Sequence, residues 1–427
     1  MLDFEKLLKE ELLLALGCTE PIAIALTAAH AGALTKEKPE QIDVYASGSI
    51  IKNANSVYVP HSGGRQGALI AAALGALVAQ PEKSLKVLEG VTDDILGEAV
   101  RLLSERRVRL HHEKDAPDVL FIRVKVTTKH HEATAVISKT HTRLVQKTLD
   151  GQTIFVLNEE EAKEQSTRSI YEKMDIPSIC AYADSIDFDQ APAVLELLEQ
   201  QIRTNMGIAQ KSIKESWGQQ VGKTLFAAAK GNIEQEAIAY AAAGSDARMA
   251  GCDHPVTINS GSGNQGITCS VPVIYIAEHS GVSHDKLLRS LLVSNLTALY
   301  QKSYIGKLSA FCGAVCASAA AACGVAYMKG LGVPCISGTL CNTLCASGGI
   351  VCDGAKGSCA LKIATALQNA FLGLHMSEKG QVFKPGDGIM GDTAEDTVRN
   401  IGRVAREGMV ETDRVILNIM TEHANRL

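Results

Sequence analysis

The sequence has few aromatic residues and no concentration of positive charge. Phe, Trp and Tyr together make up 4% of its 427 residues, and there is one Trp. The net charge is −5 at pH 7, and residues of both signs are scattered along the chain. Binding to nucleic acids or anionic membranes usually requires a basic patch, so we expect neither partner.

We also expect no secretory leader and no membrane-spanning segment. No positively charged stretch followed by an apolar run stands at the N-terminus. The most apolar stretch, 311–328, is rich in Ala, Gly, Cys and Ser rather than in the Leu, Ile and Phe of a membrane span. We predict a buried helix there and a cytoplasmic location, where the 12 cysteines are thiols, metal ligands or catalytic groups rather than disulfides.

The spacing of apolar residues predicts two regions of different architecture. A first amphipathic helix is expected to end at Gly17, and a second to span 21–34. Strand patterns follow at 57–59, 119–126, 133–138 and 153–157, with helices expected at 67–79 and 83–105. From about residue 191 the signals are nearly all helical, and Asp392 with Glu395 resembles a capping pair.

These patterns predict an α+β domain followed by a mainly α-helical domain. The first domain is expected to span 1–190 and to contain a mixed or antiparallel sheet. Its first two helices are expected to pack on the helical domain, which spans 191–427.

The cysteines are concentrated in one part of the helical domain. Eight of the 12 lie within the 48 residues from Cys312 to Cys359. This density favours a metal centre, although buried cysteines are also ordinary in Ala-rich helices. The sequence has no Cys-x-x-Cys pair, which argues against a zinc ribbon, whereas iron–sulfur clusters accept irregular spacing. Spacing alone does not select the ligands.

A further cysteine, Cys18, lies in the joint between the first two helices. The positive end of a helix dipole lowers the pKa of a thiol, so Cys18 is a candidate base or nucleophile. Glu20 is a nearby alternative base. The structural alternative is a cysteine that is simply packed between two helices.

Several polar segments have the composition of anion-binding sites. The loop 259–266 reads NSGSGNQG, in which glycines let backbone amides converge on an anion and Asn264 adds a donor. A plain turn is the alternative. The loop also resembles the Ser-x-Gly-Asn loop of pyridoxal-phosphate dehydratases, but Lys230 does not stand in a Schiff-base motif. Arg248 could pair with a carboxylate or form a surface ion pair, and 61–67 could bind a carboxylate at a helix N-terminus.

Taken together, these segments resemble the L-cysteine desulfidases, relatives of the iron–sulfur L-serine dehydratase α-subunits, nearly end to end. The resembling segments are 17–21 (GCTEP), 52–53 (KN), 141–142 (HT), 245–249 (SDARM), 259–266 (NSGSGNQG), 308–312 (LSAFC), 352–355 (CDGA) and 359–362 (CALK).

The resemblance implies a [4Fe–4S] cluster and a catalytic thiol. The implied cluster ligands are Cys312, Cys352 and Cys359, and the implied catalytic thiol is Cys18, with Glu20 as the alternative catalytic base. The implied substrate contacts are Asn53, His141, Thr142, Arg248, Ser262 and Asn264. Three protein ligands leave one iron open, which a Lewis acid requires.

The activity that this resemblance implies is an α,β-elimination lyase of amino-acid catabolism. It would convert L-cysteine to pyruvate, ammonia and sulfide without pyridoxal phosphate. An L-serine dehydratase with the same cluster is one alternative, and a non-catalytic iron–sulfur or thiol redox sensor is another. The expected partner is a small amino acid, and the sequence leaves the oligomeric state open, a homodimer included.

Overall fold

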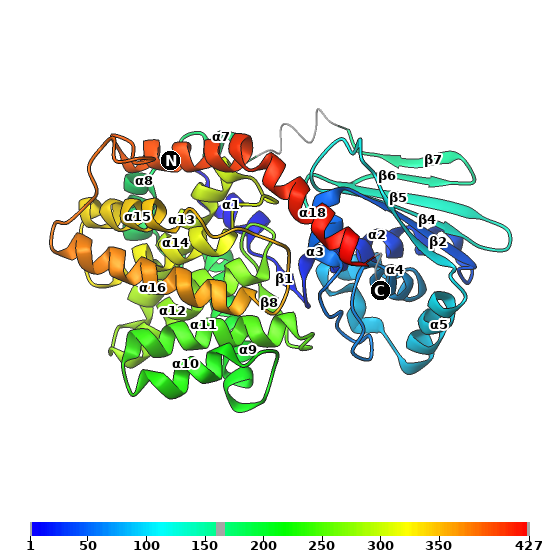
Figure 1. Cartoon of the computed structure of the whole chain (residues 1–427), viewed down its shortest axis with the longest axis horizontal. Coiled ribbons are helices and arrows are strands. Elements are labelled where there is room, and N and C mark those ends of the chain that lie inside the picture. Colours follow the sequence, from blue (N-terminus) through cyan, green and yellow to red (C-terminus); the bar gives the residue numbers. More distant parts are fainter. Residues whose placement is uncertain (1, 159–166, 425–427) are drawn as a thin grey trace.

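The structure, a computed structural model, describes residues 2–158 and 167–424. It shows an α+β half beside a larger helical half (Figure 1). This arrangement confirms the predicted fold class.

The α+β half is built on a six-stranded sheet whose strand order is β3-β2-β4-β5-β6-β7. β2 and β3 are parallel and the other neighbours are antiparallel, so the sheet is mixed. Alternate residues of β2, such as Ile42 and Val44, are fully buried, as expected for a sheet with one covered face. The strands are β2 (Gln41–Ala46), β3 (Val108–His112), β4 (Phe121–Thr127), β5 (Glu132–Ser138), β6 (Leu144–Leu149) and β7 (Gln152–Val156).

Helices cover one face of this sheet (Figure 1). α2 (Thr19–Thr35) packs against β4, β5 and α4 (Ala68–Val78), and α5 (Asp93–Ser104) lies beyond α4. Both α2 and α4 are rich in Ala, so their backbones can approach closely. The long strand-like and helical signals at 119–126, 133–138, 153–157 and 67–79 are confirmed within a few residues.

The helical half surrounds α14 (Gly313–Met328), whose residues from Val315 to Met328 are all buried. This confirms the predicted buried helix, and no helix of the described chain is long and apolar enough to cross a membrane. The other helices of this half are α1 (Phe4–Glu11), α7 (Arg168–Tyr171), α8 (Ile176–Ser185), α9 (Pro192–Lys214), α10 (Val221–Ala229), α11 (Ile233–Met249), α12 (Gly263–His279), α13 (His284–Ile305), α15 (Val333–Ser347), α16 (Cys359–Glu378) and α17 (Ala394–Arg403).

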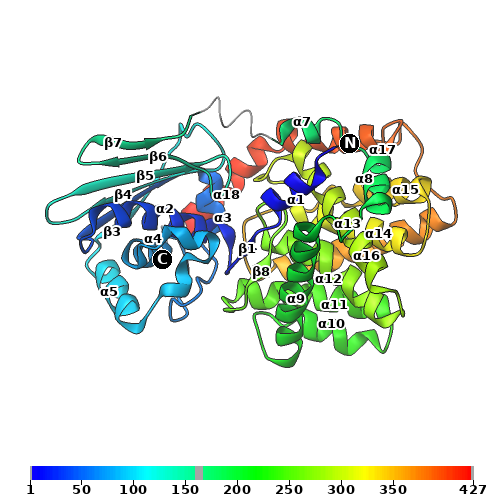
Figure 2. The ribbon, with the colours of Figure 1, turned by 180° about the vertical axis from the view of Figure 1, so that it is seen from behind.

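The chain crosses the seam between the halves more than once. α1 packs against α9 in the helical half, whereas α2 belongs to the α+β half. At the other end of the chain, α18 (Val410–Ala424) reaches back and packs on α3 (Gly48–Ala54) of the α+β half (Figure 2). The first two helices were both expected to pack on the helical domain, but α1 and α2 lie in different halves. The domain boundary near residue 190 stays a prediction.

Several local predictions were wrong at turns. The first helix ends at Glu11 rather than at Gly17, because β1 (Leu14–Ala15) pairs with β8 (Val256–Thr257). Residues 57–59 form no strand, and Tyr58 makes only a single bridge to Gln66. The single helix expected at 83–105 is instead two elements, a 3₁₀ segment, η1 (Pro81–Gly90), and the helix α5.

Other elements were missed or displaced by a residue or two. The sequence patterns did not indicate β2, β3 and β6, whose polar residues obscure their alternation. The cap of α17 is Thr393, whose hydroxyl accepts from the amide of Asp396 at 3.0 Å, rather than the pair Asp392 and Glu395. α2 begins at Thr19, two residues before Pro21, so that Cys18 is its N-cap residue.

Candidate active site

A cavity of about 100 Å³ lies at the seam between the two halves and brings together most of the expected site residues. Asn53 of α3 lines it from the α+β half. The other expected residues in its wall are Cys18, Glu20, Arg248, Ser262, Asn264, Cys312, Cys352 and Cys359. His141 and Thr142 line an adjoining cleft, which shares Lys302 and Lys307 with the cavity.

The N-termini of four helices converge on this cavity. Cys18 is the N-cap residue of α2, Ser262 that of α12 and Cys312 that of α14, while Cys359 is the first residue of α16. Each helix start carries a partial positive charge and amide groups without helical partners. The cavity is therefore suited to anions such as carboxylates and thiolates.

Basic side chains add to this positive potential. Arg248 is 2% exposed, and its Nε and Nη2 have no hydrogen-bond partner among the described residues. Lys302 is also buried, and burial lowers its pKa, while the nearby Cys316, Cys352 and Cys312 thiols act in the opposite direction. A buried guanidinium with free donors is costly unless a ligand satisfies it, so Arg248 indicates an anionic ligand.

Glu20 and Cys18 form a buried acid–thiol pair. Cys18 Sγ donates to Glu20 Oε2 over 3.2 Å. His141 Nε2 lies 3.7 Å from Glu20 Oε1, which is an ion-pair separation rather than a hydrogen bond. Burial alone would raise the pKa of Glu20, but the interactions with His141, Cys18 and Arg248 outweigh it and hold this pKa at about 2.

The expected lowering of the Cys18 pKa is wrong for this structure. Cys18 does stand at a helix N-terminus, but it is 1% exposed. Burial and the negative charge of Glu20 raise the pKa of its thiol, and the positive charge of Arg248 offsets this only in part. The pair therefore carries its negative charge on Glu20 while Cys18 holds the proton.

Two short segments hold Cys312 and Cys352 side by side. The amide of Cys312 donates to Ile350 O at 3.2 Å, and that of Cys352 donates to Ala310 O at 2.7 Å, in an antiparallel bridge. The turn that follows brings Cys359 back to the same wall, where its amide donates to Lys356 O at 3.0 Å.

The three thiols influence one another electrostatically. Burial, together with Cys352 and Cys359, raises the pKa of Cys312 to about 12. In the described part of the chain no three His, Cys, Asp or Glu side chains come close enough to ligate a single metal ion. In a [4Fe–4S] cluster each thiolate binds its own iron, so its ligands need not meet at one point. Three thiols within a basic pocket fit such a cluster.

Two glycines of the loop 259–266 make room for functional side chains. A methyl group at Gly261 would stand 2.7 Å from His141 Nδ1, and one at Gly263 would stand 2.3 Å from Arg248 Nε. Gly261 also has a φ of +75°, which L-residues with side chains rarely adopt. The glycine pattern therefore reflects close approach of His141 and Arg248 as well as backbone freedom.

Some expected contacts are already engaged within the protein. The Ser262 hydroxyl accepts from the amide of Gln265 at 3.3 Å and so caps α12. Asn53 lines the cavity, and its Nδ2 donates to Ser49 O at 2.9 Å. Thr142 lies in the adjoining cleft.

Several residues of the cavity wall were not predicted from the sequence, namely Gln265, Lys302, Lys307 and Lys362. Gln265 stands inside the loop that was singled out for its glycines. Lys302 lies in α13 among buried residues. A lysine within a largely apolar stretch of helix is unusual, so this position could have been recognised from the sequence as a candidate site residue.

Comparisons with known proteins identify the family of this chain. A family model described as serine dehydratase alpha chain matches residues 82–418. A UPF0597 protein of Finegoldia magna is 39% identical over 422 residues, covering 99% of this chain and 100% of the relative. UPF0597 proteins of Lachnoclostridium phytofermentans and Treponema denticola are 42% and 39% identical, covering 97% and 98% of this chain and 98% and 97% of the relatives. The chain therefore belongs to the serine dehydratase alpha chain family.

Proposed function

We propose that this protein is an iron–sulfur-dependent lyase that converts L-cysteine to pyruvate, ammonia and sulfide by α,β-elimination. The observation that carries the proposal is one cavity that contains three thiols, a buried guanidinium with free donors and an ionised carboxylate beside a thiol. Membership of the serine dehydratase alpha chain family supports a lyase of this general type.

Cys312, Cys352 and Cys359 are the proposed ligands of a [4Fe–4S] cluster. When bound there, the cluster would supply a Lewis acid, an iron without a protein ligand, for the leaving group of the substrate. Lys302, Lys362 and the surrounding helix N-termini offset the negative charge that three thiolates bring.

Arg248 is the proposed partner of the substrate carboxylate. A guanidinium presents parallel N–H groups that match a carboxylate in bidentate fashion. Both Nε and Nη2 are free among the described residues, and the start of α12 adds backbone amides on the same side. Binding a carboxylate here would satisfy the buried cation and orient the substrate in one step.

The Cys18–Glu20 pair is the proposed acceptor of the α-proton. The proton can pass to Glu20 directly, or to Cys18 Sγ while the thiol proton moves to Glu20 across their 3.2 Å contact. Either route adds one proton to the pair. The electron pair left at Cα forms the Cα=Cβ bond as the Cβ–S bond breaks and sulfide leaves. The resulting aminoacrylate hydrolyses with one water to pyruvate and ammonia.

L-Cysteine is proposed over L-serine because a sulfur leaving group is soft and suits an iron–sulfur centre. The same residues could also act on a hydroxyl, and a single contact usually separates such similar substrates by only about 1–3 kcal/mol. The test is kcat/KM for both amino acids on anaerobically reconstituted protein. We expect the larger value for L-cysteine. A larger value for L-serine would reject the desulfidase assignment and retain the elimination mechanism.

A redox sensor without catalytic activity is the second candidate, and the cysteine-rich cavity is the observation in its favour. The same assay separates it from a lyase. A protein with a full cluster that releases pyruvate from neither amino acid would be such a sensor.

A further inference from the structure

Gln265 is a buried side chain of the cavity to which neither the sequence resemblance nor the proposed chemistry gives a role. It is 2% exposed and stands in the first turn of α12. Its Oε1 has no hydrogen-bond partner in the described chain, and a methyl group at Gly313 would stand 2.8 Å from that atom. Because Gly313 and Gln265 both line the cavity, Oε1 lies beside the cluster ligand Cys312.

The hydrogen bonds behind Gln265 determine which end of its amide faces the cavity. Asn259 Nδ2 lies 3.2 Å from the backbone oxygen of Asn295, which can only accept. Asn259 must therefore place its nitrogen there, and its Oδ1 is left to accept from Gln265 Nε2 at 2.9 Å. Gln265 Nε2 is thus held by Asn259 on the side away from the cavity, and Oε1 is the end of the amide that is left for the cavity.

The next amide in the chain is anchored in the same way. Asn295 Nδ2 donates to Leu291 O at 2.9 Å, and Asn295 and Gln201 exchange hydrogen bonds at 2.7 and 3.0 Å. Rotating Gln265 to expose its nitrogen would bring two acceptors together at Asn259, which is costly in a buried position. Within the described chain the neighbouring Asn264 has no comparable anchor, since its Nδ2 makes only a 3.6 Å contact to Met249 Sδ there.

The cavity therefore presents donors from Arg248 and a fixed acceptor from Gln265. We propose that Gln265 Oε1 accepts a hydrogen bond from the α-ammonium group of the substrate, so that the site selects α-amino acids over carboxylic acids without this group. The inference rests on the proposed function, because it assumes that Arg248 takes the carboxylate. It assigns Gln265 to substrate selection and gives it no part in the bond-breaking steps.

The test compares binding of L-alanine and propionate, which share a carboxylate and differ in the ammonium group. Neither has a β-leaving group, so binding can be measured by equilibrium dialysis on reconstituted protein without turnover. We expect the wild type to bind L-alanine more tightly and Gln265→Met to reduce this preference by roughly 10- to 100-fold, the worth of one hydrogen bond to a charged group. The affinity for propionate should stay unchanged.

Gln301→Met is the matched control. Gln301 is also buried, with an Oε1 that has no partner among the described residues, but its Nε2 donates to Thr297 O and Cys316 O, and it does not line the cavity. This variant should keep the wild-type preference. An unchanged preference in Gln265→Met, or an equal loss of both ligands, would overturn the inference. Release of pyruvate from L-cysteine by the wild type, measured in parallel, reports on the proposed function separately.

Discussion

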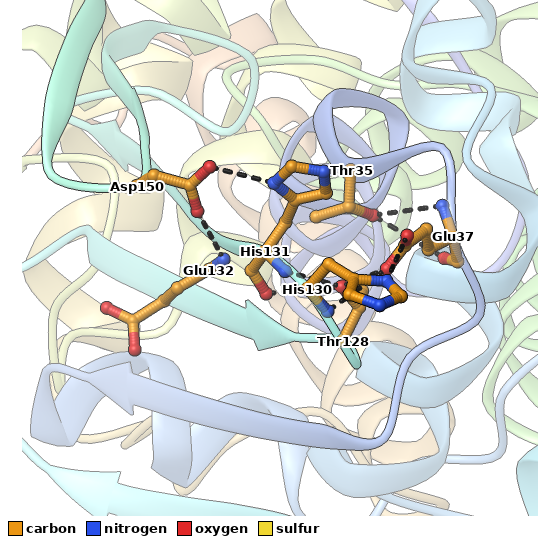
Figure 3. A network of polar contacts seen from close by, with 7 residues as sticks. All are labelled: Thr35, Glu37, Thr128, His130, His131, Glu132 and Asp150. Carbon is orange, nitrogen blue, oxygen red and sulfur yellow. Dashed lines mark hydrogen bonds and ion pairs between the residues drawn. The ribbon is translucent and has the colours of Figure 1, made fainter.

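Two of the molecule's histidine–carboxylate clusters lie in contrasting surroundings. On the surface of the α+β half, His130 pairs with Glu37 and His131 with Asp150, and Thr128 joins the two pairs (Figure 3). At the cavity, His141 of the adjoining cleft stands beside Glu20, but its Nε2 has no hydrogen-bond partner in the described chain.

The difference lies in how completely the polar groups are satisfied. His130 is 61% exposed, and the surface carboxylates accept hydrogen bonds from both backbone and side chains. The cavity instead combines burial with free donors on Arg248 and a free acceptor on Gln265. Buried polar groups without partners reduce stability, so their concentration in one cavity indicates a site that is completed by its ligand.

The largest effect should come from removing a proposed cluster ligand. Cys312→Ala, Cys352→Ala and Cys359→Ala should each abolish stable iron binding and turnover, because a cubane cluster depends on its thiolates. The wild type should contain about four irons and four sulfides per chain after anaerobic preparation. Iron and acid-labile sulfide analysis measures this directly.

Cys323→Ala provides the control for that experiment. Cys323 is fully buried in α14, and its Sγ donates to Ile336 O outside the cavity. This variant should keep its iron. Equal iron loss in all four variants, or stoichiometric zinc without sulfide, would contradict the assignment of the ligands.

The next largest effect should come from the acid–thiol pair. Glu20→Gln should lower kcat by roughly 10²- to 10⁴-fold, the usual contribution of a positioned base, and Cys18→Ala should abolish turnover. Iron content should not change in either variant, since neither residue is a proposed ligand. Activity retained by Cys18→Ala would leave Glu20 or His141 as the base, and iron loss would make Cys18 a fourth ligand. Glu37→Gln in the surface cluster is the control and should keep the wild-type kcat.

A smaller effect on substrate affinity is expected from Arg248. Arg248→Met should raise KM by about 10- to 100-fold through loss of a charge-assisted contact. The same change should not lower the melting temperature, because it removes a buried cation whose Nε and Nη2 have no partner among the described residues. Arg123→Met removes an ion pair to Glu113 on the half-exposed sheet face and should leave KM unchanged. Loss of stability without a change in KM would make Arg248 a structural residue.

The smallest effect concerns the pH dependence of the surface cluster. Hydrogen bonds from Thr128 and His130 hold the pKa of Glu37 at about 2, so its stabilisation is present above pH 4.5 and is lost as the pH falls towards 2. The hydrogen bond to Asp150 raises the pKa of His131 above 6.5, so its stabilisation is present below that pH and is lost as the pH rises through the raised pKa. The cluster should therefore contribute most between about pH 4.5 and 6.5.

Melting temperatures of the wild type and Glu37→Gln across pH 3 to 9 would measure this contribution. The difference between them should be greatest above about pH 4.5 and should shrink towards low pH. A difference that is constant over the whole range would show that these carboxylate–histidine contacts are not linked to protonation.

Sequence patterns predicted the fold class better than they predicted the electrostatics of the candidate site. A continuous apolar run indicated α14, which is buried on all sides, and alternating or β-branched residues indicated the strands β4, β5 and β7. The pairing of β1 with β8 was missed, since each contributes only two residues.

The charge state of Cys18 could not be predicted in this way. Position at a helix start lowers a thiol pKa, but the depth of burial and the direction of the Glu20 carboxylate are set by packing between distant segments. Gln265 was missed for a related reason. The orientation of its side chain follows from a hydrogen bond to Asn259, whose own orientation is fixed by Asn295. Asn295 is far from both residues in the sequence, so no local motif indicates this series of hydrogen bonds.

The measurement that tests the central claim most directly is release of pyruvate and sulfide from L-cysteine by anaerobically reconstituted protein whose iron content is known. If the seam cavity is the elimination site, pyruvate and sulfide should appear in equal amounts and at a rate proportional to the iron bound. This rate should fall by roughly 10²- to 10⁴-fold in Glu20→Gln. Protein with about four irons per chain that releases pyruvate from neither L-cysteine nor L-serine would contradict the account.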